Sequence, residues 1–405
     1  MKTPLLYLVH RIPYPPNKGD KIRSYHILSY LAKSFDIYLG AFIDNPSDWQ
    51  YESELEALCK IVHLVGLNPR RAKIKSLIGL TKGVALTIPY YHSKKMQDWV
   101  DLVLDDFNIT QAVVFSSAMA QYLSGKKYNG IQRVIDFVDV DSDKWAQYGK
   151  KQTWPMSSIY ARESQCLLSF ERQIAKEFDV NYFVSETEAR HFKSLAPESI
   201  NKVDHFNNGV DTDYFSPLKV FENPYKNGLK IVTFTGAMDY WANVDAVVWF
   251  ANAIFPQIVA QNSNCNMYII GSSPTEQVKS LGKRKNIIVT GRVPDVRPYL
   301  SYADISVAPL RIARGVQNKV LEAMAMSCMV VASLAAAEGI SANLGIDFVI
   351  ADNANKFASA CLNLLENPNN QMCTNARRCI IENYSWPTNL AKLQNSLHAN
   401  TARTL

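Results

Sequence analysis

Short apolar segments alternate with longer amphipathic segments along the whole chain, and this alternation restricts the fold more than any other feature. Apolar runs separated by helical patterns are typical of parallel sheets built from βαβ units. The first set of predicted strands covers residues 5–10, 37–42, 61–65, 112–115, 133–138, 182–185 and 203–207. The second set covers 231–235, 267–270, 287–290, 305–308, 330–332 and 348–350. We therefore predict an α/β chain whose two doubly wound domains face a central cleft.

A Pro-, Asn- and Gly-rich segment at 211–229 separates the two sets of strands. This composition favours a linker between domains. We expect an N-terminal domain over residues 1–215 and a C-terminal domain over residues 216–385. Residues 386–405 are expected to form a helix that packs back toward the N-terminal domain. With 405 residues, the chain is long enough to give each domain its own core.

The net charge of +6 comes from one part of the chain. Residues 60–95 contain eight Lys or Arg side chains and no acidic one, leaving 35 basic and 37 acidic side chains elsewhere. A net charge of +6 on 405 residues is too modest to indicate a nucleic-acid partner, and we expect none. Within this window, residues 69–80 mix cations with apolar residues at helical spacing. Such a segment can lie on an anionic membrane surface, or it can be a solvated helix with a core-facing stripe.

The seven cysteines are scattered, and no CxxC pair or Cys/His cluster has the spacing of a metal site. We therefore expect neither a disulfide framework nor a zinc site, and the reduced cytoplasm fits this composition. The longest nearly apolar run, 323–337, is shorter than the roughly 18–20 residues that span a bilayer. We expect no transmembrane helix.

In doubly wound sheets, ligands bind in the loops that follow the strands. The loop after the first predicted strand places Gly19 at a helix start, where free amides and the positive end of the helix dipole favour a phosphate. The cations Lys18, Lys21 and Arg23 surround this glycine. The alternative is a solvated turn before an ordinary helix.

The loop after the strand at 305–308 has a stronger pattern and leads into an amphipathic helix. Gly315 allows close approach of a ligand, and the amides around Gln317 and Asn318 point at an anion site. Lys319 and Glu322 share one helix face, so the cation suits a diphosphate and the carboxylate suits ribose hydroxyls. The alternative is a surface pair worth a few tenths of a kcal/mol.

Six ordered segments resemble glycosyltransferase family 4, the retaining enzymes of the GT-B fold with two Rossmann-like domains. In the second half these segments are NGVDTDYFSP at 208–217, GAMDYWAN at 236–243, GRVPDVR at 291–297 and PLRIARGVQNKVLEAMAM at 309–326. In the first half they are NKGDKIR at 17–23 and DFVDVDSDKW at 136–145. These two are closest to sugar transferases associated with PEP-CTERM exopolysaccharide systems.

The resemblance implies roles for individual residues. Glu322 would bind the donor ribose and Lys319 the diphosphate, while the Gly19 amide would approach the leaving phosphate. The remaining implied donor-side positions are Arg292 and Val293 near the base and Gly236 in the first loop of the second domain.

Two positions depart from the family pattern. Arg314 stands where the family commonly has a first glutamate, and it can add charge for the diphosphate. Where a histidine is common, this chain has Asp139 and Asp141, either of which can receive a proton or orient a sugar hydroxyl. The alternative for both aspartates is a helix cap or a turn.

The resemblance thus implies a hexosyl-type glycosyltransferase (EC 2.4) that moves a sugar, with retention, from a nucleotide sugar to a growing exopolysaccharide or lipid-linked glycan. It implies no cofactor and no metal. The expected location is cytoplasmic and peripheral on the inner face of the plasma membrane, through residues 60–95. The alternatives are a sugar-nucleotide epimerase of the same fold and a non-catalytic nucleotide-sugar-binding protein.

Overall fold

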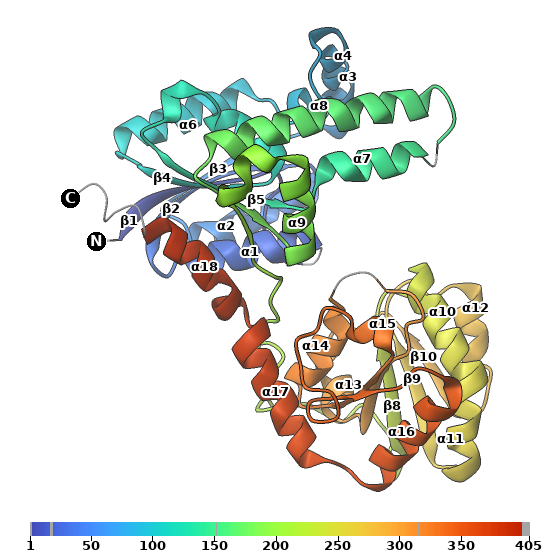
Figure 1. Cartoon of the computed structure of the whole chain (residues 1–405). Coiled ribbons are helices and arrows are strands. Elements are labelled where there is room, and N and C mark those ends of the chain that lie inside the picture. The colour runs from blue at the N-terminus through green and yellow to red at the C-terminus, as the bar shows by residue number, and fades with distance from the viewer. Residues whose placement is uncertain (1, 17–18, 151, 314–315, 399–405) are drawn as a thin grey trace. The chain divides into compact units, whose positions relative to one another are not determined.

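The computed structural model describes residues 2–16, 19–150, 152–313 and 316–398. The chain forms two compact units (Figure 1). The first contains the residues up to Asn208 together with those from Asn389 onward, and the second contains Gly209–Thr388.

The first unit is built on a seven-stranded parallel sheet in the order β3-β2-β1-β4-β5-β6-β7. Its strands are β1 Thr3–Val9, β2 Phe35–Ile43, β3 Ile61–Gly66, β4 Gln111–Phe115, β5 Gln132–Val138, β6 Val180–Phe183 and β7 Val203–His205. β4 is buried along its whole length, which explains its continuous apolar sequence, because helices cover both faces of such a sheet.

The helices of the first unit connect these strands. They are α1 Gly19–Leu31, α2 Glu52–Glu56, α3 Pro69–Ser76, α4 Ile78–Lys82, α5 Thr87–Tyr90, α6 Lys94–Asp106, α7 Asp141–Lys150, α8 Met156–Glu177 and α9 Glu186–Leu195, with 3-10 turns η1 Pro46–Tyr51, η2 Ser117–Leu123, η3 Lys126–Tyr128 and η4 Pro197–Lys202. Side-chain caps fix some of these starts: Ser185 accepts a hydrogen bond from the Glu188 amide at the start of α9. In Figure 1, α7 and α8 lie side by side.

The second unit contains a six-stranded parallel sheet in the order β10-β9-β8-β11-β12-β13. Its strands are β8 Lys230–Thr235, β9 Cys265–Ile270, β10 Ile287–Gly291, β11 Ile305–Ala308, β12 Met329–Ala332 and β13 Val349–Ile350. Its helices are α10 Trp241–Trp249, α11 Phe255–Gln261, α12 Glu276–Leu281, α13 Arg297–Ser301, α14 Asn318–Ala325, α15 Leu334–Ala337, α16 Ala354–Glu366 and α17 Asn370–Tyr384, and the π-helical turn η5 Phe250–Ile254 joins α10 to α11.

The continuous helical stretch Trp241–Gln261 is long and apolar enough to cross a membrane by length and composition, although we expected no such helix. Half of its most apolar window is buried inside the unit. Val247, Phe250 and Ile258 belong to the core under the sheet. The stretch therefore has the character of a core helix, since its apolar face is already covered by protein.

The final helix, α18 Trp386–His398, begins in the second unit and continues in the first. Its residues in the first unit are tied to the strands of that sheet. Gln111 donates to the Leu397 carbonyl at 2.7 Å, Gln132 to the Ser396 carbonyl at 2.6 Å, and the Tyr182 hydroxyl to the Lys392 carbonyl at 3.1 Å.

The two parallel α/β sheets confirm the predicted fold class, and every predicted strand is present. The segment predicted as a linker packs on the second unit. Arg377 donates to the carbonyls of Phe215 and Thr212, at 2.8 and 3.2 Å.

Candidate functional site

In the second unit, two glycines bring the loops after β8 and β9 into close contact. A Cβ atom on Gly271 would lie 1.6 Å from the Gly236 carbonyl oxygen, so only glycine fits there. A Cβ atom on Gly236 would lie 2.8 Å from Asn243 Nδ2 and 3.1 Å from Lys319 Nζ. Both glycines also have positive φ, which glycine adopts without strain. Because Gly236 has no side chain, Lys319 and Asn243 can lie close to its backbone.

Lys319 lies on the first turn of α14 and is held by two neighbouring side chains. Its Nζ donates to Asn243 Oδ1 and lies 4.3 Å from the centre of the Phe234 ring. Asn243 is oriented in turn by donating from Nδ2 to the Ala237 carbonyl at 2.8 Å. Burial lowers the pKa of Lys319 to about 8, so its charge is sensitive to what binds beside it.

Glu322 follows Lys319 on the same helix and is half-buried. Burial raises the pKa of Glu322 to about 7, although the Lys319 charge acts in the opposite direction. A carboxylate and an ammonium group poised near neutral pH are typical of a binding or catalytic site. Together they can accept hydrogen bonds from hydroxyl groups and stabilise a phosphate oxygen.

The other predicted donor-side residues surround this pair in sequence. Gln317 is at the N-cap position of α14 and Asn318 is its first residue. Arg314 and Gly315 lie outside the described residues. Arg292 and Val293 follow β10, with Arg292 exposed and Val293 half-buried.

The loop that carries Arg292 is held by a charged cluster. Arg297 forms a bidentate ion pair with Asp295, with the shortest contact at 2.6 Å, and its guanidinium lies 3.7 Å from the centre of the Tyr214 ring. The Arg297 guanidinium holds the pKa of Asp295 below its usual range, although burial acts in the opposite direction. The cluster fixes the backbone on which Arg292 and Val293 sit.

In the first unit, the loop after β5 carries the two predicted catalytic aspartates. Val138 has φ of 71°, a left-handed conformation that is strained for a β-branched residue, and the register with β6 shifts at this point. This bulge redirects the chain so that Asp139 and Asp141 both reach Lys144, at 2.7 and 3.2 Å. Ser117 donates to Asp141 Oδ2 at 3.3 Å.

A buried carboxyl group supports the start of α7. Glu171, on α8, accepts from the Ser142 amide at 3.2 Å and from the Ser142 hydroxyl at 2.6 Å. Burial raises the pKa of Glu171 to about 8, while the two Ser142 hydrogen bonds favour its ionised form. Glu171 thereby fixes the first turn of α7, which carries Asp141.

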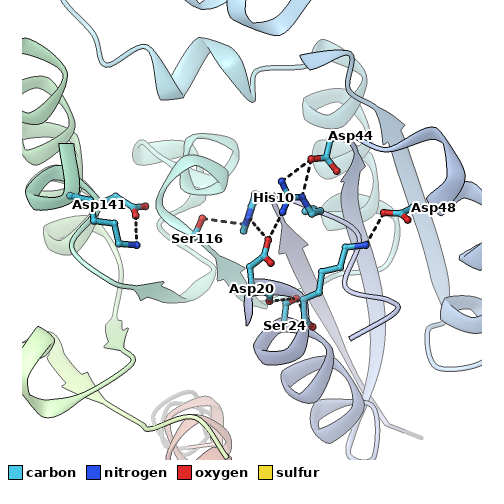
Figure 2. A network of polar contacts seen from close by, with 10 residues as sticks. His10, Asp20, Ser24, Asp44, Asp48, Ser116 and Asp141 are labelled. Carbon is cyan, nitrogen blue, oxygen red and sulfur yellow. Dashed lines mark hydrogen bonds and ion pairs between the residues drawn. The ribbon is translucent and has the colours of Figure 1, made fainter. Parts of the chain in front are cut away.

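His10 lies at the edge of this sheet that is formed by the carboxyl ends of its strands, and the sequence did not predict it as a site residue. It follows β1, its ring stacks on Phe115, and Figure 2 shows it between Ser116 and Asp20. His10 Nδ1 lies 3.3 Å from Ser116 Oγ, and Nε2 lies 3.6 Å from Asp20 Oδ2. The His10 ring and the Arg11 guanidinium hold the pKa of Asp20 well below its usual range. The one sequence feature that could have identified His10 as a site residue is its position directly after a buried strand.

Lys21 and Arg23, predicted beside a phosphate, have buried head groups with protein partners. Lys21 Nζ contacts Asp48 at 2.7 Å. Arg23 is 1% exposed and forms a bidentate pair with Asp136, at 2.7 and 3.1 Å, and it also donates to Asn208 Oδ1. Both cations therefore hold α1 against its neighbours and present no charge to a ligand. The prediction of a phosphate site around these two cations fails because carboxylates from distant segments, Asp48 and Asp136, already bind them.

The edge of this sheet is consequently balanced in charge. Besides Lys21 and Arg23, Arg11 contacts both Asp20 and Asp44 at 2.7 Å. Such an edge suits neutral hydroxyl groups better than a diphosphate. Gly19 is exposed as the first residue of α1, with open space where a Cβ would lie, and Lys18 lies outside the described residues.

Across the described parts of the chain, no group of three or more His, Cys, Asp or Glu side chains is arranged to hold a metal ion. The seven cysteines are free thiols.

Comparison with known proteins places these observations in context. Residues 229–367 match the family described as Glycosyl transferases group 1. An uncharacterised 44.6 kDa protein in the cps region of Klebsiella pneumoniae is 26% identical over 163 residues, which cover 38% of this chain and 42% of that protein. The chain therefore matches less than half the length of this relative.

Solved structures extend the likeness to almost the whole chain. Sucrose-phosphate synthase from Thermosynechococcus elongatus superposes with a TM-score of 0.65 at 15% identity, covering 99% of this chain and 100% of that chain. HepE from Anabaena in complex with UDP superposes with a TM-score of 0.63 at 12% identity, covering 98% and 100%. The chain thus has the GT-B fold, and its second unit carries a glycosyl transferases group 1 domain over residues 229–367.

Proposed function

We propose that this protein is a glycosyltransferase that moves a hexosyl group from a nucleotide sugar to a growing exopolysaccharide or its lipid-linked precursor, with retention at the anomeric carbon. The observation that carries this proposal is the Lys319–Glu322 pair on α14, inside the segment that matches the glycosyl transferases group 1 family. The relative in a cps region supports an acceptor of the polysaccharide class.

In this proposal the second unit binds the donor. As the bond from the anomeric carbon to the diphosphate oxygen breaks, negative charge develops on the phosphate. Lys319 and the amides at the start of α14 are oriented in advance to stabilise that charge, so little reorganisation is needed during the reaction. Glu322 accepts hydrogen bonds from the ribose hydroxyls. Arg292 and Val293 lie beside the base, Gly236 allows close backbone approach, and Arg314, Gly315, Gln317 and Asn318 complete the donor loop.

In this proposal the first unit binds and orients the acceptor. Its charge-balanced edge presents His10, Ser116 and Asp141, groups that exchange hydrogen bonds with sugar hydroxyls (Figure 2). In a retaining reaction, the acceptor oxygen attacks the face from which the diphosphate departs and its proton passes to the leaving phosphate. Asp139 and Asp141 orient the attacking hydroxyl, and the Gly19 amide approaches the leaving phosphate. We propose that this chemistry runs without a bound metal.

Relatives guide the choice of donor and location. HepE from Anabaena has been solved with UDP, with UDP and glucose, and with UDP-glucose, so a uridine nucleotide is the first donor to test. We further propose membership of the retaining glycosyltransferase family 4, close to its PEP-CTERM-associated transferases. We propose that the protein acts on a lipid-linked acceptor in the cytoplasm, at the inner face of the plasma membrane.

A two-stage experiment tests the function. Thermal unfolding is first followed with UDP and UDP-glucose, because a ligand bound at 100 times its Kd stabilises the folded state by about 2.7 kcal/mol. The parent should be stabilised, whereas Lys319→Met and Glu322→Gln should lose most of the shift. Lys283→Gln, which changes an exposed lysine of the same unit, should retain it.

Transfer is then measured with radiolabelled UDP-glucose and a lipid extract. Label moving into the lipid fraction supports the proposal. Isomerisation of the nucleotide sugar without an acceptor would make the protein an epimerase, and binding without transfer or hydrolysis would make it a binding protein. Either result would refute glycosyl transfer from this donor.

A further inference from the structure

The basic hairpin, which comprises α3, Leu77 and α4 (Pro69–Lys82), turns its large apolar side chains toward solvent. Ile74 is 71% exposed, Leu77 53% and Ile78 46%. The inward positions are occupied by the small residues Ala72, Ser76 and Gly79. The apolar stripe is therefore not a core-facing stripe, and burial in this unit does not explain it.

The cations of the hairpin are exposed on the same projection. Arg70, Arg71, Lys73, Lys75 and Lys82 are all exposed, and no acidic residue occurs from 60 to 95. Figure 1 shows α3 and α4 projecting from the body of the first unit, beyond α8. Contiguous exposed apolar groups on a soluble protein indicate an interaction surface. Here that surface is also strongly positive.

Long helix α8 holds the base of the hairpin through two charged side chains. Arg162 donates to the Gly79 carbonyl at 2.7 Å and to the Val84 carbonyl at 3.3 Å. Glu163, which is 1% exposed, accepts from the amides of Leu86 and Thr87, at 2.6 and 3.0 Å. The exposed side chains are thus presented on a fixed backbone, so binding through them requires little ordering.

Gly79 allows this close packing. A Cβ atom at Gly79 would lie 3.0 Å from the Val84 carbonyl oxygen. A glycine here lets the turn fold tightly under the hairpin, leaving Ile78 and Leu80 outside. The tight turn and the α8 contacts therefore act together to keep the apolar groups in solvent.

We propose that the basic hairpin docks the protein on an anionic lipid bilayer. Ile74, Leu77 and Ile78 enter the boundary between headgroups and acyl chains, while the surrounding cations contact the anionic headgroups. The positive charge of the hairpin favours a bilayer over a second copy of the chain. A second copy would bring its own cations against those of the first hairpin, and like charges repel. An anionic bilayer accommodates both the apolar groups and the positive charge. This surface is separate from the donor site and does not depend on the proposed glycosyl transfer.

The test is co-sedimentation with phosphatidylcholine vesicles prepared with and without phosphatidylglycerol. Two triple variants are compared with the parent: Ile74→Ser/Leu77→Ser/Ile78→Ser removes the apolar groups, and Arg70→Gln/Arg71→Gln/Lys73→Gln removes charge. Each should lower partitioning onto anionic vesicles by at least about tenfold, because near-surface cations and buried apolar groups both contribute to membrane binding. The parent should leave neutral vesicles largely unbound.

Matched controls alter residues of the other unit that are at least as exposed. Leu218→Ser/Val220→Ser removes apolar side chains that are 88% and 96% exposed, and Lys283→Gln/Lys285→Gln removes two exposed cations. Both control variants should bind like the parent. Because every altered side chain is exposed, the unfolding temperature should not change, and this measurement verifies folding.

Three results would overturn the proposal. These are equal binding of parent and triple variants to anionic vesicles, equal binding of the parent to neutral and anionic vesicles, and a dimer of the parent that the serine variant converts to a monomer. UDP-glucose binding is measured on the same samples. Retained donor binding with no vesicle binding would reject the docking surface alone, whereas the opposite result would reject the donor proposal alone.

Discussion

Affinity for a nucleotide sugar should pass through a maximum between pH 7 and 8 and fall on both sides. The reason lies in the two half-buried groups of α14, since burial lowers the pKa of Lys319 to about 8 and raises that of Glu322 to about 7. The diphosphate requires the protonated lysine, and the ribose hydroxyls require the ionised glutamate. Above pH 8 the free protein must take up a proton to bind, and below pH 7 it must release one.

The magnitude follows from the two pKa values. At about pH 9 roughly one tenth of the free protein has protonated Lys319, so affinity should be about tenfold weaker, or ~1.4 kcal/mol. At about pH 6 roughly one tenth has ionised Glu322, so a similar loss is expected. Near the middle of the interval both groups are mostly in the competent form, and affinity should lie within about twofold of its limit.

Isothermal titration calorimetry with UDP-glucose from pH 6 to 9 measures this profile, because the diphosphate of this ligand does not titrate in that range. Repeating it in buffers of different ionisation enthalpy counts the protons exchanged. Lys319→Met should remove the alkaline limb and Glu322→Gln the acid limb, whereas Lys283→Gln should keep both. An affinity that is flat across the range in the parent would refute the reasoning, as would a limb that survives in the corresponding variant.

Three further predictions concern the fold and the acceptor side. Arg23→Met should destabilise the protein by about 3–5 kcal/mol in urea unfolding, because it leaves Asp136 buried without its partner, and a loss below about 1 kcal/mol would contradict this. His10→Gln should lower turnover while UDP-glucose affinity is retained, and unchanged turnover would limit His10 to packing. Gly271→Ala should cost at least about 2 kcal/mol of stability, because its Cβ overlaps a carbonyl oxygen, whereas Gly130→Ala, which has open space, should not; equal unfolding temperatures would contradict the close contact.

Elements set by local sequence were predictable. The strands of both sheets are short apolar runs between turn residues, a pattern that by itself indicates strands of parallel sheets. The placement of Lys319 and Glu322 one turn apart on the same helix was also predictable, because it follows from their spacing in the sequence.

Partners contributed by distant segments were not predictable. Lys21 and Arg23 stand in a loop pattern that favours a phosphate, yet Asp48 and Asp136 reach them from other elements and neutralise them. His10 was not predictable as a site residue, because its role depends on Ser116, which the sheet order places beside it.

The basic hairpin shows this division most clearly. Helical spacing alone establishes that Ile74, Leu77 and Ile78 form a stripe, and composition alone establishes that cations surround it. Neither says which side of the helix faces the protein. Tertiary packing determines which side faces the protein. The tight turn at Gly79 and the hydrogen bonds from α8 leave room inside only for small residues, so the large apolar groups face outward. Periodicity is a property of one helix, whereas burial depends on what the rest of the chain places against it.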